Sequence, residues 1–254
     1  MAHTPPRVHI VTPIVSEGFR DDAPLRAALP PGCEVTSGVL SRGPASVESA
    51  VDEVLAAPGV VDAALAAEAG GAAAVVIDCM LDPGLEAARE AVGIPVIGCG
   101  MAGLAAAAAQ GRYAIVTVLQ RQERLFRPLA ARHGTGDALA SVRGIGVPVL
   151  ELERDRPASI EKTVAAARTA RDEDGAEAIV FGCTGMLGFA RPVAEALGWN
   201  AARVIDPLPH AVTVALDLAL HGGVERAPAP DRKRVEGFEG WPALHAAMRP
   251  KVSA

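Results

Sequence analysis

Two of the four cysteines stand at matching places in an internal repeat of the chain. The segment 71–79, GAAAVVIDC, aligns with the segment 175–183, GAEAIVFGC, so that Cys79 and Cys183 lie 104 residues apart (183 − 79 = 104). The segments VHIVT at 8–12 and YAIVT at 113–117 repeat at nearly the same distance. Two segments that share one offset indicate a duplicated unit, with a cysteine at the end of a Val/Ile-rich run in each copy.

A pair of thiols that face one substrate suits the exchange of a carbon-bound proton. A thiolate on one side can remove the proton, and a thiol on the other side can deliver one to the opposite face. Two equivalent halves would provide such a pair without a cofactor. Cys33 and Cys99 have no cysteine at the repeat distance, and a lone buried cysteine commonly serves as a small apolar side chain.

The elements that must position these cysteines alternate along the chain. Short Val/Ile-rich runs are separated by Ala-rich helical patterns, which predicts β-α-β units and an α/β fold. We expect two pseudo-symmetric domains, each a mainly parallel sheet flanked by helices, with the active site between them. The first domain is predicted to comprise residues 1–97 together with a returning segment, 208–254, and the second residues 98–207. Predicted strands are 8–14, 34–40, 73–78, 95–97, 113–119, 142–150, 178–182 and 203–205, and predicted helices are 19–29, 60–68, 83–91, 101–110, 121–133, 160–173, 187–197 and 208–221.

Ligands of open α/β sheets bind at the carboxyl ends of the strands, where both cysteines are expected to lie. A helix start after each cysteine would offer unpaired N–H groups that lower the pKa of a thiol and stabilise a negatively charged oxygen. Asp82 and Pro83 read as the cap and first residue of such a helix. Strand alternation is expected to turn Asp78 away from the thiol. The residues expected to bind substrate are Pro13, Ile14, Met80, Thr117, Val118, Thr184 and Gly185.

Other polar residues are weaker candidates. Thr12 and Thr117 end the repeated strands, where each could bond a substrate oxygen or cap the backbone. Arg20, Arg121 and Arg124 follow those strands. Most arginines in such places are solvated, so an arginine that faces the thiols would indicate a carboxylate substrate.

Composition narrows the class of protein. The chain has 254 residues, half of them hydrophobic, and a net charge of −6, which argues against nucleic acid or an anionic membrane as a partner. No apolar signal stretch opens the sequence, and no apolar run approaches the roughly 20 residues that a membrane helix needs. We therefore expect a cytoplasmic protein with reduced thiols. The cysteines lack zinc-site spacing, so no metal is expected. The segment 231–234, DRKR, is interpreted as part of a solvated tail, which is followed by a short helix near 241–248.

Several segments together resemble the aspartate/glutamate racemase superfamily, and within it the hydantoin racemase-like branch. They are CMLDPGLEAARE at 79–90, PVIG at 95–98, VPVLELE at 147–153, and DGAEAIV at 174–180 followed by GCTGM at 182–186. The resemblance implies that Cys79 and Cys183 act as catalytic base and acid, that no cofactor is used and that the protein is a homo-oligomer. Hydantoin racemases typically carry Asn-Pro-Asn after the first strand, where this chain has Thr12, Pro13 and Ile14.

The expected activity is racemisation of a small molecule at a carbon next to a carbonyl. The resemblance favours a 5-substituted hydantoin or a related cyclic ureide such as allantoin. Two alternatives stay open, namely an amino-acid racemase of the aspartate/glutamate type and a non-catalytic small-molecule-binding protein on the same scaffold.

Overall fold

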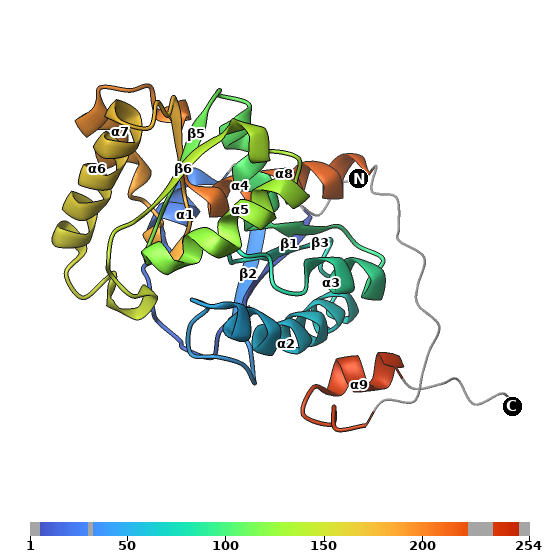
Figure 1. The fold of residues 1–254 in the computed structure, drawn as a ribbon. Coiled ribbons are helices and arrows are strands. Elements are labelled where there is room, and N and C mark those ends of the chain that lie inside the picture. The colour runs from blue at the N-terminus through green and yellow to red at the C-terminus, as the bar shows by residue number, and fades with distance from the viewer. Residues whose placement is uncertain (1–5, 30–32, 223–235, 249–254) are drawn as a thin grey trace, which may run out of the picture.

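The computed structural model describes residues 6–29, 33–222 and 236–248, in which strands and helices alternate regularly (Figure 1). The strands are β1 (Arg7–Thr12), β2 (Glu34–Val39), β3 (Ala74–Ile77), β4 (Val96–Gly98), β5 (Tyr113–Thr117), β6 (Leu139–Gly144), β7 (Ala178–Phe181) and β8 (Val204–Ile205). The α-helices are α1 (Ala23–Ala28), α2 (Ala50–Ala69), α3 (Leu85–Ala91), α4 (Cys99–Ala108), α5 (Glu123–Arg132), α6 (Arg156–Asp172), α7 (Ala190–Leu197), α8 (Pro207–His221) and α9 (Pro242–Met248). Short 3₁₀ turns are η1 (Gln120–Gln122), η2 (Gly136–Ala138), η3 (Val149–Glu151), η4 (Thr184–Met186) and η5 (Ala201–Arg203).

The strands form two parallel sheets with the same topology. One has the order β2-β1-β3-β4 and the other the order β6-β5-β7-β8, so each strand of the first sheet has its counterpart in the second. The predicted α/β fold with two similar halves is therefore confirmed. In both sheets the strand that precedes a repeated cysteine, β3 or β7, lies in the interior of the sheet.

The last helix of each repeat packs on the sheet of the other half. Helix α4 follows β4 of the first sheet and packs against β7 and β8 of the second, whereas α8 follows β8 and packs against β1, β3 and β4. The two helices also contact each other, and in Figure 1 they lie between the sheets. This packing favours the division into residues 1–97 with 208–254 and residues 98–207, which stays a proposal.

Apolar side chains fill both faces of the central strands. All residues of β3, β5 and β7 are buried, as a parallel sheet covered on two sides requires. Two hydrophobic clusters result, and the larger one contains residues of both sheets, such as Ile10 of β1 and Ile115 of β5. The partly buried Phe19 packs against both clusters.

Some predicted boundaries were wrong. Helix α2 begins ten residues before the predicted 60–68 helix (60 − 50 = 10), because Ser49 caps its start and the helix continues through Pro58. Strand β6 covers 139–144 rather than 142–150, since the chain turns at Gly146, which has a φ of 71°. Helix α9 lies at the predicted position, whereas the segment 231–234 falls outside the described residues. In the described ranges no helix is both long and apolar enough to cross a membrane.

Candidate active site

Cys79 and Cys183 line one pocket at the carboxyl ends of the two sheets. Cys79 lies two residues beyond the end of β3 and Cys183 two residues beyond the end of β7, so the repeat places them at equivalent positions. The pocket has a cavity volume of about 30 Å³ and is partly open to solvent. Both cysteines are partly buried and neither is in a disulfide. The two halves thus bring their equivalent thiols to a shared cavity.

Five of the residues expected to bind substrate line this pocket. They are Pro13, Ile14, Met80, Thr184 and Gly185. Thr117 and Val118 do not line it, and their role in substrate binding stays a prediction. Both are fully buried, and the Thr117 hydroxyl donates to Gln122 Oε1 at 2.8 Å, so that Gln122 forms the wall in its place.

Eight further residues complete the pocket, and sequence reasoning did not single most of them out. The pocket also contains Thr12, Phe19, Val47, Asp78, Leu81, Gln122, Val149 and Gly182. Most of its side chains are apolar, and the polar groups gather near the cysteines at the strand ends. None of the described lining residues is a lysine, arginine or histidine.

Each sulfur accepts a hydrogen bond from the backbone N–H of the residue two positions further along the chain. The N–H of Gly185 donates to Cys183 Sγ at 3.3 Å, and the N–H of Leu81 occupies the corresponding place for Cys79. These donors favour the thiolate over the thiol. After Cys183 the chain forms the short turn η4, whereas the helix after Cys79 begins only at Leu85. The predicted helix start at Pro83, with Asp82 as its cap, is therefore wrong, because α3 is preceded by Gly84 as its cap.

Burial acts against ionisation of both thiols. It raises the pKa of Cys183 to about 12 and that of Cys79 well above its ordinary value of 9.0. The positive charge of Arg20 lowers the pKa of Cys183 while the negative charges of Asp78 and Glu48 raise it, whereas the charges of Asp82 and Asp78 only raise the pKa of Cys79. Arg20 is therefore the charge that favours ionisation of Cys183 over that of Cys79.

Asp82 holds the loop after Cys79 in a different way from the one predicted. Its carboxylate accepts the N–H groups of Gly100 at 2.8 Å and Met101 at 2.7 Å, and so caps α4 rather than α3. The residue has a φ of 51°, and its Oδ2 lies 3.2 Å from His133 Nε2 at the end of α5. Asp82 thereby ties the Cys79 loop to helices that lie beside the second sheet.

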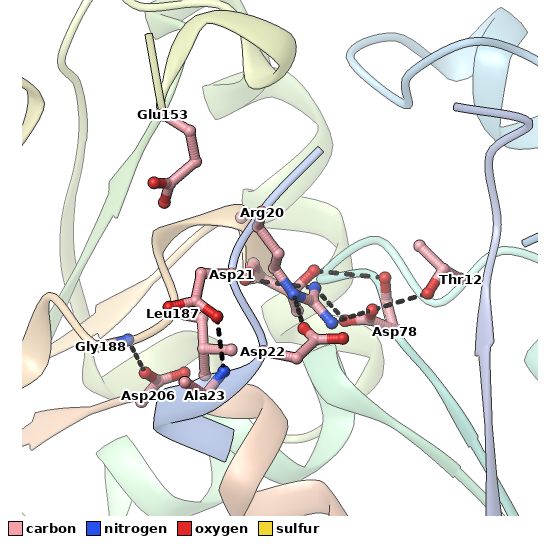
Figure 2. A network of polar contacts seen from close by, with 12 residues as sticks. Thr12, Arg20, Asp21, Asp22, Ala23, Asp78, Glu153, Leu187, Gly188 and Asp206 are labelled. Atoms are coloured by element: carbon pink, nitrogen blue, oxygen red, sulfur yellow. Dashed lines mark hydrogen bonds and ion pairs between the residues drawn. The ribbon is translucent and has the colours of Figure 1, made fainter. Parts of the chain in front are cut away.

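Asp78 was expected to turn away from the thiol and to have a structural role, and this stays a prediction. Strand β3 ends at Ile77, and Asp78 is among the residues that line the pocket, although its side chain is fully buried. Its buried carboxylate pairs with Arg20, whose side chain is only 3% exposed (Figure 2). Arg20 also pairs with Asp22. Arg20 is thus neutralised by two carboxylates, while Arg121 pairs with Glu48 at the surface.

The geometry suits acid–base chemistry on a small uncharged molecule. Two thiols face one cavity, backbone N–H groups are aimed at their sulfurs, and apolar side chains form most of the remaining wall. Within the described part of the chain, no cluster of three His, Cys, Asp or Glu side chains is arranged to hold a metal ion.

Comparisons with known proteins agree on one family. The family model described as Asp/Glu/Hydantoin racemase matches residues 22–215. The chain is similar to a hydantoin racemase of Paenarthrobacter aurescens, at 37% identity over 72% of this chain and 77% of that one. It is 40% identical to a hydantoin racemase of Pseudomonas sp. (strain NS671) over 61% of this chain, and the match spans only 63% of that relative. The structure resembles that of an allantoin racemase from Klebsiella pneumoniae with a TM-score of 0.86, at 31% identity over 93% of this chain and 98% of the other.

Proposed function

Because the chain belongs to the Asp/Glu/hydantoin racemase family, we propose that it is a cofactor-independent racemase of the hydantoin and allantoin type. Its substrate is a 5-substituted hydantoin or a related cyclic ureide, and the reaction inverts the carbon next to a ring carbonyl. The observation that carries the proposal is the placement of Cys79 and Cys183, from equivalent positions of two halves, on one pocket.

The two cysteines exchange roles in each turnover. The thiolate of one removes the proton from the ring carbon, and the electron pair of the broken C–H bond passes into the carbonyl to form an enolate. The thiol of the other cysteine then donates its proton to the opposite face, which restores the C–H bond in inverted form. The first cysteine ends as a thiol and the second as a thiolate, so the reverse reaction begins from the product state.

The pocket favours a neutral ring with an apolar substituent. Ile14, Phe19, Val47 and Val149 offer an apolar wall, and Gln122 and Thr184 offer hydrogen-bonding groups for the ring. An amino-acid substrate would need a cation for its carboxylate. Arg20 is engaged by Asp78 and Asp22, and no described lining residue provides another cation.

A racemisation assay with single cysteine variants tests the proposal. Optically pure 5-alkylhydantoins, allantoin, aspartate and glutamate are followed by circular dichroism in D₂O, together with deuterium entry at the inverted carbon. We expect Cys79→Ser and Cys183→Ser to lose racemisation, while each keeps some deuterium exchange into one enantiomer only. Cys33→Ser is the matched control, because Cys33 does not line the pocket.

Two outcomes would contradict the proposal. If both single variants racemise a hydantoin at the wild-type rate, the thiols do not carry the reaction. If the wild-type protein binds these compounds without exchanging deuterium, and both variants bind them equally well, the protein is a small-molecule-binding protein on this scaffold.

A further inference from the structure

The residues next to the two cysteines are bonded to each other across the pocket. Asp78 precedes Cys79, and Thr184 follows Cys183. The Thr184 hydroxyl donates to the backbone carbonyl of Asp78 at 3.2 Å. A direct link therefore joins the strand end of one half to the catalytic turn of the other.

Arg20 makes a second link between the same two residues. Its Nη2 lies 2.7 Å from Asp78 Oδ2, and its Nη1 donates to Asp78 Oδ1 at 3.0 Å and to the carbonyl of Thr184 at 3.4 Å. Its Nε donates to Asp22 Oδ1 at 2.7 Å, which holds the guanidinium from the outer side. Thr12 donates its hydroxyl to Asp78 Oδ2 at 2.9 Å from the far side of that carboxylate (Figure 2).

The chemistry of the guanidinium makes this link a rigid one. A two-pronged arginine–carboxylate pair fixes both distance and orientation, because the planar donors match the two carboxylate oxygens. The Arg20 side chain is 3% exposed and that of Asp78 is 0% exposed, so solvent neither screens the pair nor replaces it. A lysine at position 20 would keep the positive charge, but it could not form the two parallel hydrogen bonds to the carboxylate of Asp78.

Arg20 also places part of the pocket wall. Its guanidinium lies over the ring of Phe19, with the central carbon 4.9 Å from the ring centroid. Phe19 lines the pocket and packs against both hydrophobic clusters. The segment after β1 is therefore anchored at Arg20, where the strand end of Cys79 and the turn of Cys183 meet.

We propose that Arg20 is a positioning residue that fixes the separation of the two thiols across the substrate. The inference rests on the proposed function, since only a two-base inversion needs both sulfurs at set distances from one carbon. Proton removal needs one sulfur in place, whereas inversion needs both. A looser link should therefore harm delivery to the opposite face more than it harms proton removal.

The test is the ratio of deuterium exchange with retention to inversion, measured in D₂O with a hydantoin that the wild-type protein racemises. For Arg20→Lys we expect kcat of inversion to fall about tenfold to a hundredfold. The ratio of retained exchange to inversion should rise at least about fivefold, an order-of-magnitude expectation from the same argument. The matched control is Arg143→Lys, because Arg143 makes an equally forked pair with Asp174 away from the pocket and should leave the ratio unchanged.

The outcomes separate this inference from the proposed function. An inactive wild-type protein contradicts the proposed function, whereas an active one with an unchanged ratio in Arg20→Lys overturns only the role of Arg20. A lower rate with an unchanged ratio also overturns it, because general destabilisation slows both steps together. If Arg20→Lys does not fold, Asp78→Asn is the variant that tests the role of Arg20 instead. It keeps the side-chain volume and one acceptor for Arg20, and it must raise the same ratio.

Discussion

Gly185 leaves room beside Cys183 that no other residue type would leave. A β-carbon at position 185 would lie 3.0 Å from Leu152 Cδ1, 3.3 Å from Cys183 Sγ and 3.7 Å from the ring of Phe19. Carbon atoms in contact prefer about 3.5–4.0 Å, so the first of these distances must open by a few tenths of an ångström. Leu152 is 1% exposed and cannot move into solvent, which directs part of the displacement towards the sulfur.

The Gly185→Ala variant therefore tests whether the position of Cys183 limits the reaction. Overpacking of this size costs about 1–3 kcal/mol of unfolding free energy. A displaced reacting group costs up to about a hundredfold in rate. We expect kcat/KM for racemisation to fall about tenfold to a hundredfold. Alanine keeps the N–H that donates to the sulfur, so the loss would be steric rather than electrostatic.

The assay compares initial racemisation rates with urea unfolding of the same preparations. Gly38→Ala is the control, since a β-carbon there would meet only the ring of His9, at 3.9 Å. A Gly185→Ala variant that racemises at the wild-type rate would show that Cys183 tolerates the displacement, and the geometric reasoning would then be wrong. Equal losses in both variants would also contradict it.

Three further perturbations have defined outcomes. Burial raises the pKa of Asp206 to about 6 from its ordinary 3.8, so the folded state loses stability as pH rises from about 4 to 6. Asp206→Asn keeps an acceptor for the Gly188 N–H and should stabilise the protein by up to about 3 kcal/mol at pH 7, with no gain at pH 4 in urea unfolding. Asp82→Ala removes the cap of α4 and should cost about 2 kcal/mol of unfolding free energy, with a smaller loss in Asp82→Asn; equal losses would contradict the capping role. Because burial holds the pKa of Cys183 near 12, kcat/KM should rise from pH 7 to pH 9, and a flat profile of initial rates would show that the thiolate is already formed.

The repeat in the sequence predicts much of the fold and the central pair of the site. The offset of 104 residues predicts two halves, and strands that end near Cys79 and Cys183 predict a pocket between them. These inferences depend on periodic apolar runs, which a parallel sheet with two covered faces requires. The structure agrees because the two sheets share one strand order.

The rest of the site depends on contacts between segments far apart in the chain. Thr117 matches Thr12 in the repeat, yet the hydroxyl of Thr12 bonds Asp78 while that of Thr117 bonds Gln122. Local sequence holds no sign of this difference, because it arises from loops that differ between the halves. From the sequence alone Arg20 is predicted to be solvated, whereas in the fold it forms a buried ion pair with Asp78.

Helices α4 and α8 each cover the sheet of the other half, and this packing suggests how a two-domain chain of this kind could evolve. A chain with only one copy of the repeat would leave its last helix without a sheet to cover and its own sheet with a bare apolar face. Two such chains could satisfy both needs by swapping that helix, in a symmetric dimer whose two identical cysteines share one cavity. Fusion of the two genes would then release each half to diverge, so that one could acquire the Arg20–Asp78 pair while the other kept the smaller Thr117–Gln122 contact.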